Sequence, residues 1–166
     1  MDQSKLNNKR LRSGERTIAD SLEKLTAVQL FRYTVAYPYM KYSDTVADLG
    51  CGAGYGSFLL TKKSEKVVGI DDSQETIKYA QQNWPSDKIE YSCMNILDVT
   101  DKFDVVIIHE VIEHVKDVEE LFKVLGQITK RYLIFTVPSP KQKQTNKFHW
   151  KHYHPDEIKA LLEKII

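Results

Sequence analysis

Short apolar runs alternate along the chain with segments whose apolar residues recur every three or four positions. Runs of this length, bounded by glycine, proline or charged residues, predict buried strands, whereas the three-and-four spacing predicts helices. The predicted strands cover residues 45–49, 67–71, 89–93, 103–108 and 132–137. The predicted helices cover residues 55–62, 73–84 and 118–128, and a last one opens at Pro155. Strands that alternate with helices in this way predict an α/β fold with a doubly wound parallel sheet.

The first 40 residues or so depart from this alternation. They begin with a basic arm, in which lysines and arginines outnumber acidic residues over residues 1–16. A helix is predicted next, because apolar residues recur at steps of three and four until Tyr37 and Pro38 end it. The stripe that defines this helix consists of Leu22, Leu25, Val28, Phe31 and Val35.

Length and composition indicate a single domain over residues 1–166, long enough to bury a core. The formal net charge is +1, so the chain as a whole has no strong electrostatic preference for one kind of partner. No apolar run reaches membrane-spanning length, and the polar start of the chain lacks the apolar segment of a signal peptide. We therefore expect a cytoplasmic protein without a membrane partner, in which Cys51 and Cys93 are free thiols.

The most informative motif follows the first predicted strand, where the chain reads D-L-G-C-G-A-G-Y-G. Glycines are favoured where a backbone turns sharply and a ligand approaches it closely. Asp71 ends the next strand 21 positions after Gly50, close to the spacing of about 20 that places an acid on a ribose diol. A dinucleotide motif needs a third glycine where Tyr55 or Ser57 stands. The carboxylate of Asp48 would also repel a pyrophosphate, so a nicotinamide-dependent oxidoreductase is disfavoured.

This D-x-G-x-G-x-G pattern resembles the S-adenosylmethionine (SAM) loop of class I methyltransferases, and the resemblance runs from about Gly14 to the end of the chain. It implies a Rossmann-like sheet whose first acid and glycine loop hold the methionine end of SAM. The acid after the second strand would bind the ribose, and a polar–apolar pair after the third would hold the adenine. Asn95 has the alternative role of starting a turn. The implied cofactor-binding residues are Asp48, Gly50, Cys51, Gly52, Gly54, Tyr55, Asp71, Asp72, Asn95, Ile96, His109 and Glu110.

The chain departs from the family pattern around the fifth predicted strand. The family usually closes its sheet with an antiparallel hairpin, and this sequence stops at Ile166 before either hairpin strand. The glycine pair that commonly precedes strand five is missing as well. Strand five would then be a bare edge, which favours pairing or cover. The alternatives are a homo-oligomer paired through this edge, cover by the last helix or the N-terminal arm, and a truncated chain.

A second motif, E-V-I-E-H, follows the fourth predicted strand and recurs in several methyltransferase groups, including the ubiquinone-type O-methyltransferases. In one interpretation Glu113 and His114 only organise the following helix. In the other, Glu110, Glu113 and His114 bind Mg²⁺ or Mn²⁺, which accept carboxylate oxygens and imidazoles. A resemblance to the small-RNA 3′-terminal 2′-O-methyltransferases implies His149 as a further ligand. Because the segment around His149 also resembles metal-free small-molecule methyltransferases, we favour the metal-free interpretation and assign no metal ligand.

Two histidines are candidates for a general base, because a neutral imidazole suits proton abstraction near pH 7. The resemblance places His109 beside the sulfonium of a bound SAM and His149 on the acceptor side. The late segment is basic and aromatic, which suits an anionic or planar acceptor, and the alternative is a solvated loop with packed aromatics. Its residues are Lys141, Lys143, Lys147, Phe148, Trp150, Lys151 and Tyr153.

Together these features predict a SAM-dependent methyltransferase with an anionic acceptor that the sequence does not identify. A small-molecule or nucleotide-like acceptor is favoured over a protein, and nucleic acid stays among the alternatives. Two other functions also stay open. One is a metal-assisted O-methyltransferase of RNA or a sugar hydroxyl, and the other is a SAM-binding subunit without catalysis.

Overall fold

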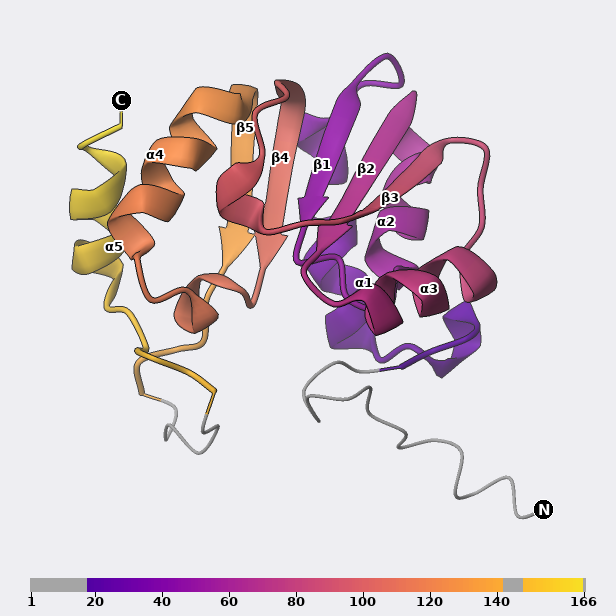
Figure 1. Cartoon of the computed structure of the whole chain (residues 1–166), viewed down its shortest axis with the longest axis horizontal. Helices are drawn as coiled ribbons and strands as arrows, with labels where there is room; N and C mark the ends of the chain where they lie inside the picture. Colours follow the sequence, from indigo (N-terminus) through magenta and orange to yellow (C-terminus); the bar gives the residue numbers. More distant parts are fainter. Residues whose placement is uncertain (1–17, 142–147, 166) are drawn as a thin grey trace.

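The computed structural model describes residues 18–141 and 148–165. Its strands form one sheet in the order β3-β2-β1-β4-β5, with every neighbouring pair parallel (Figure 1). This arrangement confirms the predicted doubly wound fold. Because the chain order reverses between β1 and β4, a crevice is expected outside the carboxyl ends of these strands. The strands span Thr45–Leu49 (β1), Lys66–Asp71 (β2), Ile89–Cys93 (β3), Phe103–His109 (β4) and Thr129–Thr136 (β5).

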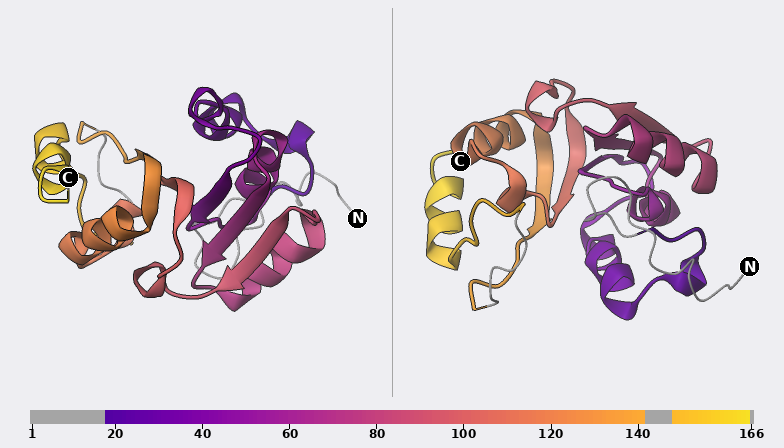
Figure 2. Two further views of the ribbon diagram at one scale, coloured as in Figure 1. Left: turned by 90° about the horizontal axis from the view of Figure 1, so that it is seen from above. Right: turned by 60° about the horizontal axis from the view of Figure 1, so that its bottom comes forward.

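Helices cover both faces of the sheet (Figure 2). The α-helices span Ala27–Thr34 (α1), Tyr55–Leu60 (α2), Gln74–Asn83 (α3), Val118–Ile128 (α4) and Pro155–Leu162 (α5). Short 3-10 turns span Leu22–Lys24 (η2), Tyr37–Tyr39 (η3), Thr61–Lys63 (η4), Ile96–Asp98 (η5) and Ile112–His114 (η6). None of the helices in the described segments combines the length and apolar character needed to cross a membrane.

The core has two halves because successive residues of a strand point to opposite faces of the sheet. Val46 and Val105 pack on the side of α1 and α2, together with the tryptophan that ends α3. Ala47 and Val106 pack on the side of α4 and α5. The central strands are therefore buried on both faces, as their continuous apolar runs predict.

Capping residues fix where the later helices begin. Ser73 accepts a hydrogen bond from the N–H of Thr76, so the helix predicted after this residue is confirmed. The last helix opens at Pro155 as expected, preceded by a capping box between His154 and Glu157. The helix predicted over residues 55–62 is α-helical only to Leu60 and continues as the turn η4.

The predicted N-terminal helix is wrong in both continuity and orientation. Thr26 forms a capping box with Gln29 and starts α1 afresh, so η2 and α1 are separate elements. Val28 and Phe31, which belong to the predicted stripe, are 62% and 65% exposed. The side of α1 that faces the molecule carries Tyr33 instead. The basic arm at residues 1–16 lies outside the described residues.

The fifth strand begins at Thr129 rather than at Tyr132, directly after α4. Its polar start is held by ion pairs, since Lys130 lies 3.7 Å from Asp104 and Arg131 lies 2.6 Å from Asp44. β5 is the last strand of the sheet, and no strand within the described residues pairs with its outer edge.

Candidate active site

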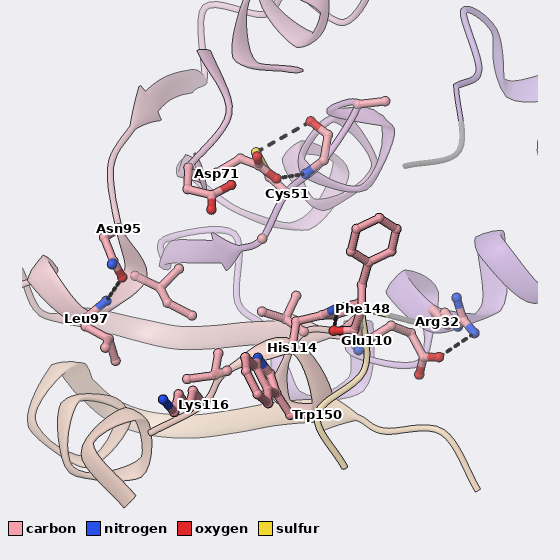
Figure 3. Close-up of a pocket in the computed structure, with 18 of the residues that line it drawn as sticks. Arg32, Cys51, Asp71, Asn95, Leu97, Glu110, His114, Lys116, Phe148 and Trp150 are labelled. Carbon is pink, nitrogen blue, oxygen red and sulfur yellow. Dashed lines mark hydrogen bonds and ion pairs between the residues drawn. The ribbon is translucent and has the colours of Figure 1, made fainter. Parts of the chain in front are cut away.

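A pocket of about 760 Å³ lies at the carboxyl ends of the strands (Figure 3). Its lining residues follow β1, β2, β3 and β4, which is the edge where parallel sheets place their ligands. Two segments distant in sequence complete the wall, namely α1 and the late segment at Phe148 and Trp150. Every predicted cofactor-binding residue lines this pocket except Asp48 and Gly54.

The glycine loop after β1 depends on glycine for conformation and for space. Gly50, Gly52 and Gly54 have φ values of 71°, 53° and 90°, which side chains disfavour. A Cβ on Gly50 would lie 2.3 Å from Val111, and one on Gly54 would lie 2.6 Å from Ala80. For a Cβ on Gly52, the nearest heavy atom outside its two chain neighbours would be the backbone oxygen of Gly50, 4.0 Å away. Gly52 therefore presents bare backbone to open space at the pocket.

Asp71 joins this loop to the end of β2. One carboxylate oxygen accepts from the N–H of Gly52 at 3.1 Å, and the other accepts from the N–H of Ser73 at 3.0 Å. The N–H groups of Gly50 and Cys51 also donate to a carbonyl of β2. These bonds fix the loop against the strand, so Asp71 is a rigid acceptor at the wall of the pocket, with Asp72 beside it.

Asn95 both starts a turn and lines the pocket. Its side-chain oxygen accepts from the N–H of Leu97 at 2.9 Å and so caps η5. The turn-starting role is therefore confirmed. An amide oxygen has two lone pairs, so the same atom can accept a second hydrogen bond. Ile96 and Leu97 supply the apolar wall beside it.

Asp48 lies beneath the glycine loop, not in the pocket lining. Ser57 donates to its carboxylate at 2.6 Å and Tyr33 donates at 3.4 Å. Burial raises the pKa of Asp48 to about 7, and these two hydrogen bonds oppose that rise. The side chain is fully buried, and its contact with a methionine amine stays a prediction.

His109 ends β4 at the floor of the pocket. Its ring meets that of Tyr33 edge to face, with the centroids 5.0 Å apart. Burial, reinforced by the charge of Arg32, lowers the pKa of His109 to about 4, so the imidazole is neutral at pH 7. Neither ring nitrogen has a hydrogen-bond partner within the described residues. Both nitrogens are buried, and the backbone of Arg32 lies close enough to oppose the fall in the pKa of His109.

Glu110 has a backbone conformation that is uncommon for a residue with a side chain, since its φ is 54°. Its N–H donates to the carbonyl of Thr136, and its carboxylate accepts from the Thr136 hydroxyl at 2.9 Å. The other carboxylate oxygen lies 3.2 Å from the guanidinium of Arg32. Glu110 therefore connects β4, β5 and α1 at one rim of the pocket.

Three of the four candidate metal ligands meet beside the pocket. Glu113, His114 and His149 offer ligand atoms that all lie within 4.8 Å of one another. Glu110 is not part of this group, so the four-residue set is wrong in that member. The Nδ1 atom of His149 lies 2.8 Å from the Nε2 atom of His152. Within the part of the chain that the structure describes, no other residues gather in this way.

The late segment is held against the E-V-I-E-H turn by its backbone. The N–H of Trp150 donates to the carbonyl of Glu113 at 2.8 Å, and a ring nitrogen of His114 lies 3.2 Å from the carbonyl of Phe148. This docking places Phe148 and Trp150 in the wall of the pocket, whereas His149 does not line it.

The predicted cationic lid is only partly described. Lys143 and Lys147 lie outside the described residues. Lys151 forms an ion pair with Glu157, and Tyr153 belongs to the core. The described part of the segment therefore supplies aromatic surface to the pocket rather than positive charge.

Sequence reasoning missed the contribution of α1, which places Arg32 and Tyr33 in the pocket wall. Tyr33 lies so close to the glycine loop that a Cβ on Gly56 would come within 1.9 Å of its ring. A fourth glycine directly after the loop was the one available signal that another element packs there. It did not identify the element.

Comparisons with known proteins agree with this geometry. A mycobacterial protein of Mycolicibacterium smegmatis, named "Probable S-adenosylmethionine-dependent methyltransferase", is 26% identical over 91% of this chain and 63% of its own length. The ubiquinone biosynthesis O-methyltransferase of Bradyrhizobium diazoefficiens is 38% identical over 47% of this chain and 32% of its own length. The chain thus spans 63% or less of these curated relatives.

Solved structures show the same fold. Magnesium protoporphyrin IX methyltransferase from Synechocystis, solved with bound S-adenosylhomocysteine, superposes with a TM-score of 0.67 at 20% identity. The match covers 85% of this chain and 77% of that protein. A family model described as a methyltransferase domain matches residues 47–135, which is more than half of the chain. The predicted family is confirmed, and the chain belongs to the methyltransferase domain family.

Proposed function

We propose that this chain binds SAM and transfers its methyl group to a small-molecule or nucleotide-like acceptor. The observation that carries the proposal is the joint geometry of the glycine loop and Asp71. Gly52 presents backbone to open space, and its N–H is bonded to a carboxylate that also lines the pocket. Backbone with no side chain in the way and a fixed acid at the end of β2 suit a ribose-bearing ligand.

The residues of the pocket fit SAM in their donor and acceptor character. Asp71 would accept from ribose hydroxyls, and Asn95 with Ile96 and Leu97 would hold the adenine by one hydrogen bond and an apolar wall. The sulfonium end would lie toward His109. Among the lining residues at the end of β4, only Glu110 carries a carboxylate. Bound there, SAM supplies an electrophilic methyl group.

The protein's own contribution is mainly to hold donor and acceptor in line. His109 would accept the hydrogen bond of an acceptor hydroxyl and take its proton as the new bond forms. With a pKa of about 4, it is a weak base toward a resting hydroxyl. A hydroxyl that is gaining a methyl group becomes strongly acidic, so the proton transfer belongs late in the reaction.

The names of relatives support an oxygen acceptor. Several ubiquinone biosynthesis O-methyltransferases match this chain, with identities of 34% to 40% over about half of it. These matches leave about half of the chain uncovered, and the pocket is lined also by α1 and the late segment. The acceptor itself is therefore not carried over from these proteins.

Calorimetric titration with SAM and S-adenosylhomocysteine tests the proposal directly. Asp71→Ala should weaken binding by about one to two decades, because hydrogen bonds to charged groups contribute roughly 1.5–3 kcal/mol. Asp101→Ala, an exposed acid away from the pocket, is the matched control and should bind like the parent protein. Unchanged affinity in Asp71→Ala, or tighter binding of NAD than of SAM, would reject the assignment.

A second candidate is metal-assisted transfer to RNA or to a sugar hydroxyl. It is favoured by one observation, the meeting of Glu113, His114 and His149 beside the pocket. A divalent ion there would lower the pKa of an attacking hydroxyl. Metal analysis of the purified protein distinguishes the two candidates, and a SAM-binding subunit without catalysis would bind SAM yet methylate no acceptor.

A further inference from the structure

Arg32 is the one arginine among the residues that line the pocket. Its side chain is 33% exposed, and its ion pair within the described residues is with Glu110, through a single nitrogen at 3.2 Å. A guanidinium carries five N–H donors in a planar fork. One contact with one nitrogen leaves part of that fork able to bind a second acceptor oxygen on the pocket side.

Glu110 holds Arg32 in this position. Its carboxylate is fixed by the Thr136 hydroxyl at 2.9 Å, and its backbone by a bond to the same residue. The left-handed φ of 54° costs energy that the surroundings must supply. Residues with such a backbone conformation cluster at functional sites. Here the carboxylate of Glu110 points toward the guanidinium of Arg32 in α1, as Figure 3 shows.

His109 defines the other end of the same space. It is 8% exposed and has no hydrogen-bond partner within the described residues, yet it lines the pocket. Its two ring nitrogens are buried, and the backbone of Arg32 lies close enough to oppose the fall in the pKa of His109. The residue that precedes Glu110 thus packs a neutral ring against the helix that carries Arg32.

Aromatic rings form the walls between these two ends. Tyr33 and Tyr55 line one side, with their ring centroids 5.7 Å apart, and Phe148 and Trp150 come from the late segment. Rings of this kind favour a planar apolar body. The pocket therefore combines an aromatic wall with a cationic rim.

We propose that Arg32 determines acceptor specificity by binding an anionic oxygen group, a carboxylate or a phosphate, on a planar acceptor whose hydroxyl receives the methyl group. This rests on the proposed methyltransferase function and names the acceptor class for it. In the reaction, the hydroxyl oxygen gains the methyl group and the donor sulfur keeps the electron pair of the broken bond. The proton passes from the oxygen to water.

The test uses the full chain saturated with S-adenosylhomocysteine and titrated with matched ligand pairs. The pairs are hydroxybenzoates against the corresponding hydroxybenzamides, which replace the charge and keep the shape, with hydroxyphenyl phosphates as the phosphate arm. At least one anionic ligand should bind about tenfold or more tighter than its amide, the gain expected of a charge-assisted hydrogen bond. The stronger arm identifies the anionic group.

Variants then assign the preference to one residue. Arg32→Gln should reduce the preference for the anion to about twofold or less, and Arg32→Lys should reduce it in part, because lysine keeps the charge but lacks the fork. Lys66→Gln is the matched control, an ion-paired cation at the start of β2, and should leave the preference unchanged. If Arg32→Gln does not fold, the result with Arg32→Lys decides.

Several results would overturn the inference. They are binding of no anionic ligand in the panel, equal binding of acids and amides, and a preference that survives in both Arg32 variants. Failure of the proposed function looks different, because the parent protein would then not bind S-adenosylhomocysteine at all.

Discussion

At the scale of single residues, two buried ionisable groups at or beneath the pocket have pKa values that have moved in opposite directions. Burial raises the pKa of Asp48 to about 7 and lowers that of His109 to about 4. Both shifts favour the neutral form, and Tyr33 touches both side chains. At neutral pH His109 is uncharged and Asp48 is about half ionised. The lining itself carries charged side chains of both signs, among them Arg32, Lys116, Glu110 and Asp71.

The shift of His109 predicts a pH dependence of stability. Its folded pKa lies below the ordinary value of 6.5, so the unfolded chain binds the proton more readily. The stabilisation is present above pH 6.5 and is lost as the pH falls through 4. Relative to His109→Gln, the parent protein should lose on the order of 2–3 kcal/mol over this range. Urea unfolding at several pH values measures the difference, and a difference independent of pH would contradict the burial of a neutral imidazole.

At the scale of elements, the carboxyl ends of the strands form one part of the pocket wall, and α1 and the late segment complete it. α1 is seated through Tyr33, which fits against the glycine loop because Gly56 has no side chain. The late segment is seated on the turn η6 through backbone hydrogen bonds. Both closures join segments that are far apart in sequence, so each can be weakened without disturbing the sheet.

Gly56→Ala tests how α1 packs against the start of α2 through Tyr33. The new Cβ would come within 1.9 Å of the Tyr33 ring, and overpacking of this kind costs about 1–3 kcal/mol. We expect a lower free energy of unfolding together with weaker binding of S-adenosylhomocysteine, because the loop and α1 move apart. Gly126→Ala is the matched control in α4, where the nearest atom is 3.2 Å away on Ile165 near the chain end. Equal effects of the two substitutions would show that Tyr33 is not the cause.

The metal-free interpretation of the E-V-I-E-H turn makes its own prediction. Glu110 is engaged by Arg32 and Thr136, so a metal would find one carboxylate fewer than the sequence suggests. We expect the melting temperature to be the same in chelator and in Mn²⁺, and Glu113→Gln to lower stability in both. Stabilisation by Mn²⁺ in the parent protein that disappears in Glu113→Gln would establish the metal site instead.

At the scale of the whole molecule, the sheet ends on one side at β5, whose residues are less buried than those of the central strands. At the start of this strand Lys130 pairs with Asp104 and stays 47% exposed, and Arg131 pairs with Asp44. The rest of the strand is apolar or uncharged, and an unpaired edge strand is a template for another strand. We propose that it pairs with a second copy of the chain.

Sedimentation and hydrogen exchange test this pairing together. The protein should associate as its concentration rises, and the amides of β5 should become protected over the same range, because strand pairing buries their N–H groups. The amides of β1, in the middle of the sheet, are the internal control and should stay protected throughout. A monomer at high concentration with rapid exchange along β5 would exclude it.

The sequence by itself determined the sheet and the donor side of the pocket. The apolar runs of β1 and β3 have the bounds that the structure shows, and Asp71 and Asn95 lie at the pocket because each follows a parallel strand. These features depend on residues that are adjacent in sequence, so a local pattern is sufficient to find them. The start of β5 was missed because Lys130 and Arg131 interrupt the apolar pattern, and their partners are on other elements.

The tertiary structure alone decided the part of the pocket wall that α1 forms. Which face of α1 is buried depended on the cap at Thr26 and on the space that Gly56 leaves for Tyr33. The pairing of Glu110 with Arg32 likewise joins the turn after β4 to a helix far earlier in the chain. Such contacts depend on how separate elements pack, and the spacing of residues along one element carries no record of that packing.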